Sequence, residues 1–174
     1  MNGKAFLIVG GTGAGKSTIS RKMVLKFPEN NRFIYDINNE YSDIYKKPLI
    51  DFKTFAGNTI RLNNACILFE EATIFLDNKI SNSFIRELLV RKRWTKNTII
   101  LNFHSFRSIP KYIFNLCNYV IILKTNDSEN FVDKTFDNDE LTKAFNIVKN
   151  KDWLKTPSGL KYSPHLLFDI YAAN

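Results

Sequence analysis

KAFLIVGGTGAGKST, from Lys4 to Thr18, is the most informative segment of this sequence. Gly10, Gly15, Lys16 and Ser17 complete the pattern G-x-x-x-x-G-K-[ST], in which the glycines let backbone N–H groups converge on phosphate oxygens. The lysine of such a loop places its ammonium against the β- and γ-phosphates of a nucleotide, and the hydroxyl ligates Mg²⁺. The sequence therefore predicts a P-loop that binds ATP and Mg²⁺. The predicted nucleotide-binding residues are consecutive: Gly10, Gly11, Thr12, Gly13, Ala14, Gly15, Lys16, Ser17 and Thr18.

The residues on either side of this loop fit the strand and the helix that a P-loop joins. Ala5–Val9 is a short apolar run typical of a buried parallel strand. From Ile19 to Phe27 apolar residues recur at helical spacing, and Pro28 ends the predicted helix. The helix would begin near Gly15, so that its positive end points at the bound anion.

The composition indicates one globular domain. The 174 residues are 44% hydrophobic and include 15 phenylalanines, which favours a packed core. No apolar run approaches the roughly 18 residues that span a bilayer, and the apolar segment before the P-loop is shorter than a signal peptide. Cys66 and Cys117 lie within apolar segments, which predicts reduced core thiols and a cytosol-like compartment. We expect a single P-loop ATPase domain over residues 1–174, with a motor core over about 1–150 and a tail over 151–174 of unassigned role.

A net charge of +8 suggests a polyanionic partner, with nucleic acid as the first candidate. The alternative is a solvated lysine-rich surface, because the basic residues are scattered along the chain. No pattern of aromatic and basic residues predicts sequence-selective reading of bases, so we expect contacts to the backbone of DNA. The candidate contacts are basic residues on predicted loops: Lys46, Lys47, Lys53, Arg107 and Lys111.

Apolar strands alternate with helices along the rest of the chain. Further strands are predicted over four segments: Arg32–Ile37, Ala65–Phe69, Thr98–Leu101 and Tyr119–Leu123. Apolar spacing over Ile80–Leu89 predicts a helix, and a short one is expected over Lys111–Leu116. This alternation indicates an α/β fold, with a parallel sheet covered on both faces.

Three segments give weaker signals. Asn38–Gly57 is predicted to be irregular, and Thr59–Leu62 to form a short extra strand. The spacing of Asp137 and Glu140 resembles a capping box that opens a helix. The tail from Trp153 onward is aromatic and punctuated by prolines, and its pattern predicts no element.

The run CILFEE, from Cys66 to Glu71, supplies the acids that ATP hydrolysis needs. An apolar strand would deliver both carboxylates at the carboxyl edge of the sheet, where the P-loop also lies. Glu70 is predicted to hold Mg²⁺, directly or through water, and Glu71 to act as the general base for the attacking water. The alternative is a strand that ends in two solvated acids.

Four segments together resemble the FtsK/HerA superfamily. They are GTGAGKS in the P-loop, YDINNEYSD over Tyr35–Asp43, the strand that ends in Glu70 and Glu71, and TIILNFHSFRSIP over Thr98–Pro110. The resemblance implies a P-loop NTPase three-layer sandwich of the additional-strand, catalytic-glutamate type, with a central, mostly parallel sheet of at least five strands. Members of this superfamily are ATPases that pump DNA. Viral genome-packaging ATPases and the Zot-like morphogenesis proteins of filamentous phages are among them.

The chain departs from the superfamily's pattern at two positions. Glu70 stands where the usual acid is aspartate, and a glutamate can still reach Mg²⁺ from one methylene further out. The polar sensor after the fourth strand, commonly glutamine, would be His104, with Asn102 as a competing candidate. The resemblance implies that such a side chain donates a hydrogen bond to the γ-phosphate or to the attacking water. The alternative for His104 is a loop histidine without a role.

The resemblance also implies an arginine finger from a neighbouring subunit, which stabilises charge that develops during phosphoryl transfer. Arg93 is the first candidate and Arg91 the second, because both lie near the end of the helix predicted before the fourth strand. Arg86 and Arg93 fall on the face opposite the apolar stripe of that helix. Arg107 is a third candidate, for a finger or for a DNA contact. An ordinary solvated basic face is the alternative for the helix.

The sequence thus favours an ATP-hydrolysing nucleic-acid translocase, and the subtype expected is a viral or phage DNA-packaging ATPase that acts as an oligomeric ring. We expect it in the cytoplasm, that of the host if the protein is viral. Association with the virion, or with a capsid or other assembly component, is left open. A small-molecule kinase for nucleosides or nucleotides is the alternative, with Arg86, Arg91 and Arg93 as a phosphate-clamping lid. A P-loop regulator without motor activity is a third interpretation.

Overall fold

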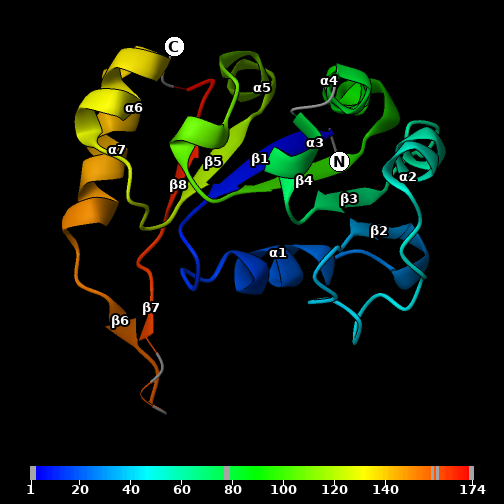
Figure 1. The fold of residues 1–174 in the computed structure, drawn as a ribbon, viewed down its shortest axis with the longest axis horizontal. Coiled ribbons are helices and arrows are strands. Elements are labelled where there is room, and N and C mark those ends of the chain that lie inside the picture. Colours follow the sequence, from blue (N-terminus) through cyan, green and yellow to red (C-terminus); the bar gives the residue numbers. More distant parts are fainter. Residues whose placement is uncertain (1–2, 77–78, 158, 160, 173–174) are drawn as a thin grey trace.

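A six-stranded sheet forms the centre of the computed structural model, which describes residues 3–76, 79–157, 159 and 161–172. The strand order is β2-β3-β4-β1-β5-β8 (Figure 1). The strands of this sheet are β1 (Lys4–Val9), β2 (Arg32–Tyr35), β3 (Cys66–Phe69), β4 (Thr98–Phe103), β5 (Tyr119–Ile122) and β8 (Leu166–Asp169). All neighbours pair in parallel except β8, which is antiparallel to β5. Because β4 lies between β1 and β3, the predicted additional-strand arrangement is confirmed.

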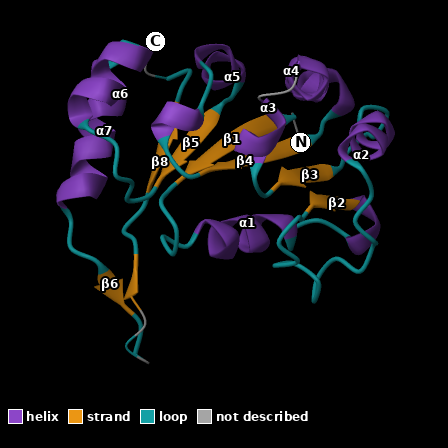
Figure 2. Cartoon of the chain, viewed as in Figure 1, coloured by secondary structure: helices purple, strands orange, loops and turns teal. Residues whose placement is uncertain are grey.

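Helices cover both faces of the sheet, as the alternation of strands and helices predicted (Figures 1 and 2). Helix α1 (Lys16–Val24) lies on one face, together with the segment that follows β2. The other face carries the remaining helices: α2 (Phe52–Thr59), α3 (Ala72–Leu76), α4 (Lys79–Thr95), α5 (Lys111–Leu116), α6 (Glu129–Phe136) and α7 (Asp139–Asn150). Short 3₁₀ turns occur at Glu29–Asn31 and Phe106–Ser108.

The hydrophobic core has two layers, because successive residues of a strand point to opposite faces of the sheet. In β1, Leu7 and Val9 belong to the larger cluster under α4–α7, while Ile8 belongs to the cluster under α1. Both cysteines are buried and free, as predicted. Burial raises the pKa of the thiols of Cys66 and Cys117 to about 12. Both thiols are therefore neutral members of the core.

Two sequence predictions between β2 and β3 are wrong, one in part and one entirely. The predicted irregular segment ends in helix α2, and no strand forms over 59–62, where α2 ends and a turn follows. Asp51 begins this helix, because its carboxylate accepts the N–H of Thr54 at 3.0 Å. Strand β2 is also shorter than predicted, since it ends at Tyr35 before a polar turn.

A third correction concerns the start of α7. Asp137 has φ 50° and ends the unpredicted helix α6 in the left-handed conformation, which Asp tolerates better than most residues. Asn138 is the N-cap of α7 instead, and its side chain accepts the N–H of Leu141 at 2.8 Å. The helix predicted from Ile80 is confirmed as part of α4, although the side chain of Ile80 lies outside the described residues.

The tail that the sequence left unassigned forms strands. Leu154–Lys155 and Lys161–Tyr162 pair as the antiparallel hairpin β6–β7, which lies below the left side of the sheet in Figure 1. The chain then returns as β8 and closes the β5 edge of the sheet. Among the described residues, no helix combines the length and the apolar character needed to cross a membrane.

Candidate active site

The glycine-rich loop lies at the carboxyl edge of the sheet, where it is anchored between two strands. The N–H of Gly10 donates to Phe103 O at the end of β4 (3.0 Å), and that of Gly11 donates to Lys124 O after β5 (2.8 Å). Gly13 and Gly15 have φ of 73° and 99°, a region that favours glycine. Gly13 and Gly15 therefore allow the sharp turn from β1 into α1.

The first turn of α1 presents uncapped backbone N–H groups with a lysine beside them. Gly15 precedes the helix, and no side chain of the described residues caps its first N–H groups, which leaves these donors to a bound phosphate. Lys16 lies at this turn, mostly buried, and its Nζ donates to Gly10 O at 2.8 Å. Burial lowers the pKa of Lys16, and the negative charges of Glu71 and Glu70 partly oppose this effect.

Glu70 is buried at the end of β3 and accepts three hydrogen bonds. Ser17 donates to its Oε1 at 3.1 Å, while Tyr41 and Asn102 donate to its Oε2 at 2.5 Å and 2.8 Å. Burial raises the pKa of Glu70, although the hydrogen bonds from Tyr41, Ser17 and Asn102 oppose this effect by favouring the carboxylate. The hydroxyl of Ser17 and the carboxylate of Glu70 thus lie side by side beneath the P-loop. Because Mg²⁺ prefers oxygen ligands and commonly takes only one or two from a protein, this pair fits a magnesium site.

Tyr41 is a site residue that sequence analysis missed. It is fully buried, and the turn that positions it is held by Asp36, whose carboxylate accepts the N–H groups of Glu40 and Tyr41 at 3.0 Å and 2.7 Å. The guanidinium of Arg21 lies over the tyrosine ring at 5.4 Å. The segment YDINNEYSD was noted for its resemblance, but its spacing does not show that the tyrosine reaches across to β3.

Glu71 faces the loop that follows β4. Its Oε1 lies 2.6 Å from Nε2 of His104, and Nδ1 of the same imidazole lies 3.2 Å from Nζ of Lys16. The predicted base and the predicted sensor are therefore in contact, and the P-loop lysine contacts the other side of the ring.

Asn102 lies deeper than His104, and both ends of its carboxamide are engaged. It donates to Glu70 at 2.8 Å and accepts a hydrogen bond from Ser20 at 3.0 Å. Ser20 is one turn after Lys16 on α1 and was not singled out in the sequence. In this structure Asn102 orients Glu70. Of the two candidates for the polar sensor, His104 is the one whose side chain is exposed at the mouth of the site.

Arg93 is not brought to this site. It is exposed near the end of α4, and the chain enters β4 at Thr98, which is level with Lys4 at the opposite edge of the sheet from the P-loop. The six-residue strand β1 separates these edges by about 16 Å. Within one chain Arg93 therefore cannot reach its own P-loop, and a role as a finger toward a neighbouring subunit stays a prediction. Arg91 pairs with Glu87 at 3.0 Å on the same exposed part of α4.

Arg107 lies on the same side of the sheet as the P-loop. Its side chain is 65% exposed and lines a pocket of about 370 Å³ with His104 and with Gly11 and Thr12. Its Nε is 3.8 Å from the buried carboxylate of Asp127. Among the other predicted DNA contacts, Lys47 instead lies over the ring of Phe33 (4.3 Å).

A larger pocket opens on the α1 side of the P-loop. Its volume is about 660 Å³, and the β6–β7 hairpin forms its far wall through Pro157 and Tyr162. Thr18 and Ile19 from the start of α1 form the near wall. The pocket is large enough for the base of a nucleotide, and nothing in the sequence of the tail predicted that the hairpin would line it.

The fold of this chain is similar to that of two solved viral proteins. The DNA-packaging ATPase B204 from Sulfolobus turreted icosahedral virus superposes with a TM-score of 0.75 at 16% identity, over 100% of this chain and 96% of that one. The genome-packaging NTPase B204 from Sulfolobus turreted icosahedral virus 2, in complex with ATP-γS, gives 0.74 at 17% identity over the same shares. This chain has a P-loop NTPase fold.

More distant similarity and the sequence comparisons add less. The N-terminal domain of the zonular occludens toxin from Neisseria meningitidis gives a TM-score of 0.52 at 13% identity, over 72% of this chain and 79% of that one. No protein-family model matches the sequence, and no curated protein matches it either. At these identities the similarity lies in the fold, so any role must be argued from the site.

Proposed function

We propose that this chain is an ATP-hydrolysing nucleic-acid translocase of the viral DNA-packaging type, which acts as an oligomeric ring in the host cytoplasm. The observation that carries the proposal is the contact between Glu71 and His104 at 2.6 Å, directly beside Lys16 of the P-loop. A carboxylate held by an imidazole at the mouth of a phosphate site is suited to activate water. Glu70 and Ser17 beneath the loop supply the oxygen pair for Mg²⁺.

The chain's own residues divide the work of hydrolysis. Lys16 exchanges its bonds to backbone carbonyls for the β- and γ-phosphates, and the N–H groups of the first turn of α1 bind the same anion. Glu71 takes a proton from the attacking water, while His104 fixes the orientation of the carboxylate. Magnesium, held by Ser17 and Glu70, would neutralise charge on the phosphates. The pocket between α1 and Tyr162 takes the base.

The positions of the arginines weaken the kinase alternative. A lid that clamps phosphates would have to close over the P-loop, but Arg91 and Arg93 lie near the end of α4, at the opposite edge of the sheet. A glutamate beside the phosphate site also suits the activation of water, which is the nucleophile in ATP hydrolysis. No contact among the described residues favours the kinase.

Nucleic acid as the partner is supported by charge and by the solved relatives. The net charge is +8, and Arg107 lies exposed beside the P-loop. The two similar viral proteins are described as a DNA-packaging ATPase and a genome-packaging NTPase. We infer backbone contacts without base specificity, and we extend the proposal to docking on a capsid or another assembly component.

The test is ATP hydrolysis by the purified protein at low salt, with and without DNA. DNA should raise the rate, and the stimulation should fall steeply as salt is increased. Lys16→Ala should abolish both the basal and the stimulated rate, because the phosphates lose their ammonium. Stimulation by a nucleoside that becomes phosphorylated would replace the motor with a kinase, and turnover by Lys16→Ala near the wild-type rate would reject the P-loop assignment itself.

A further inference from the structure

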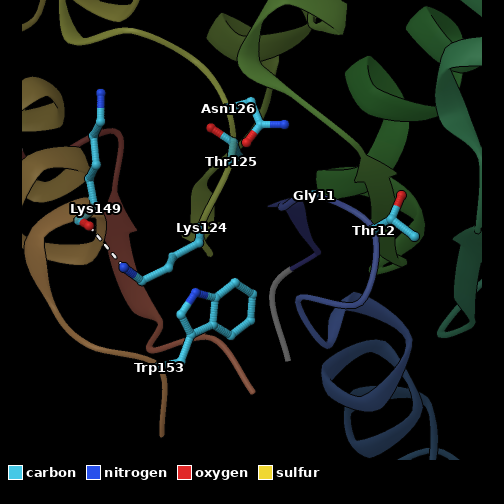
Figure 3. Close-up of a pocket in the computed structure, with 7 residues that line it drawn as sticks. All are labelled: Gly11, Thr12, Lys124, Thr125, Asn126, Lys149 and Trp153. Carbon is cyan, nitrogen blue, oxygen red and sulfur yellow. Dashed lines mark hydrogen bonds between the residues drawn. The ribbon is translucent and has the colours of Figure 1, made fainter. Parts of the chain in front are cut away.

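A pocket of about 360 Å³ lies against the P-loop on the side away from α1 (Figure 3). The backbone of Gly11 and Thr12 forms one wall, and Trp153 forms another. The indole is 42% exposed and is directed toward the loop, below the side chain of Lys124. The mechanism of ATP hydrolysis proposed above assigns no role to this large, partly exposed aromatic ring beside the P-loop.

The polar groups of this pocket are held in place by neighbouring contacts. Nζ of Lys124 donates to Lys149 O at 2.9 Å, and Lys124 O accepts the N–H of Gly11 at 2.8 Å. The ammonium of Lys149 points away from the pocket and donates to Asp127 O at 3.3 Å (Figure 3). Lys124 is therefore the cation that the pocket presents.

The chemistry of the lining fits a nucleobase. The indole offers a flat apolar face, and Asn126 and Thr125 offer a carboxamide and a hydroxyl that can donate and accept hydrogen bonds. None of the described residues that line this pocket carries a carboxylate, so its charge favours a ligand that bears phosphate.

The pocket continues toward a second basic residue. Gly11, Thr12 and Asn126 also line the pocket of about 370 Å³ in which Arg107 lies. The two pockets thus form one path across the tip of the P-loop, with Trp153 at one end and Arg107 at the other. This path is longer than a single base needs. Its aromatic ring and its separated cations suit a strand of nucleic acid.

The proposed function gives the base of the nucleotide on the P-loop a different place. Phosphates bound at the first turn of α1 lead past Thr18 into the pocket of about 660 Å³ that is lined by Tyr162. That pocket lies on the other side of the loop, so it shares none of the residues that line the Trp153 pocket.

We propose that the Trp153 pocket binds an unpaired nucleobase of a nucleic-acid strand, which stacks on the indole while Lys124 and Arg107 contact its phosphates. This inference rests on the proposed function and gives the nucleic acid a contact point next to the P-loop. A movement of the P-loop during the ATP cycle would then act directly on the bound nucleic-acid strand.

Tryptophan fluorescence tests the site, because the chain has two tryptophans and the other one, Trp94, is 86% exposed on α4. In the Trp94→Phe variant without ATP, a thymidine oligonucleotide should quench the emission of Trp153, and ATP-γS should not. Trp153→Ala should weaken binding of a labelled oligonucleotide about tenfold, since stacking of one base contributes on this scale. Trp153→Phe should keep most of the affinity, and Trp94→Ala should keep all of it.

The remaining outcomes separate this inference from the proposed function. Quenching by ATP-γS and not by the oligonucleotide would make Trp153 a platform for the nucleotide base and overturn the inference. Unchanged oligonucleotide affinity in Trp153→Ala would also overturn the inference. Equal quenching by a blunt duplex would overturn it as well. In both cases the translocase proposal would stand. If the wild-type protein binds no nucleic acid at low salt, both proposals fail.

Discussion

The imidazole of His104 lies against the carboxylate of Glu71, with 2.6 Å between Nε2 and Oε1. The other ring nitrogen, Nδ1, lies 3.2 Å from Nζ of Lys16. A lysine ammonium can only donate, so Nδ1 must accept, and the ring proton of the neutral imidazole then lies on Nε2. His104 therefore donates to Glu71 in this state. In the proposed function Lys16 would turn to a bound phosphate and Nδ1 would lose that donor, so the ring would link phosphate binding to Glu71.

Glu71→Gln should stop ATP turnover while nucleotide binding persists. An amide cannot take a proton from water, and general-base catalysis contributes roughly 10²–10⁴-fold in rate. The measurement is single-turnover hydrolysis, together with the affinity for ATP-γS. A variant that hydrolyses ATP within a few-fold of the wild-type rate would show that Glu71 is not the base.

His104→Ala should lower the rate of hydrolysis less than Glu71→Gln does, because the base is still present but is no longer oriented. The double variant, Glu71→Gln with His104→Ala, should be no slower than Glu71→Gln alone. The effects of the two substitutions should not add, because His104 acts through Glu71. If the two losses multiply, His104 acts on the phosphate independently of Glu71.

Tyr41→Phe should destabilise the protein by about 1–2 kcal/mol, because the buried carboxylate of Glu70 loses a donor. The same change should raise the Mg²⁺ concentration needed for hydrolysis, since Tyr41 helps to orient the carboxylate beside Ser17. Urea unfolding and a Mg²⁺ titration measure the two effects. Tyr171→Phe, at a tyrosine that is 54% exposed, is the matched control and should change neither.

Glu70→Gln should change how stability depends on pH. Burial raises the pKa of Glu70 above its ordinary value of 4.5, so between these two values the folded state binds more protons than the unfolded state. The contribution of Glu70 to stability is therefore full below about pH 4.5 and is lost as the pH rises through the folded pKa. The difference in unfolding free energy between Glu70→Gln and wild type, measured without nucleotide or Mg²⁺, should shift in favour of the variant as pH rises to neutral. A constant difference from pH 4 to 8 would contradict the raised pKa.

The elements that contribute most to the site were also the most predictable ones. The P-loop and the acids after β3 depend on short contiguous patterns, GGTGAGKS and CILFEE, whose chemistry can be inferred from sequence alone. Apolar runs such as Ile99–Leu101 predicted the central strands correctly, because strands of a parallel sheet are buried on both faces.

The missed features depend on contacts between distant segments. Tyr41 contacts Glu70, which lies 29 positions later in the sequence. The residues around Tyr41 suggest a turn and do not show that contact. The tail carries weak local signals because its strands are short: β6 and β7 have two residues each, and β8 is stabilised by pairing with β5. Helix α2 was missed because Gly57 suggested a break, whereas the cap at Asp51 and the burial of Phe55 decide the conformation.

Arg93 lies at the edge of the sheet opposite its own P-loop. If it serves a neighbouring subunit, hydrolysis per subunit should rise with protein concentration as rings form. Arg93→Ala should bind ATP normally, because its own Lys16, Ser17 and Glu70 are unchanged, but it should lose roughly 10³-fold or more in rate, the scale of an arginine finger.

Mixing two inactive proteins decides between a finger in trans and an ordinary surface arginine. Arg93→Ala subunits keep an intact Glu71, and Glu71→Gln subunits keep an intact Arg93, so some interfaces of a mixed ring would pair an intact base with an intact finger. Partial recovery of ATP hydrolysis is therefore expected in the mixture. Full activity of Arg93→Ala alone, or a mixture that stays inactive although mixed oligomers form, would exclude Arg93. Arg107 would then be the arginine to test, because it lies at the same edge of the sheet as the P-loop and could act within its own subunit.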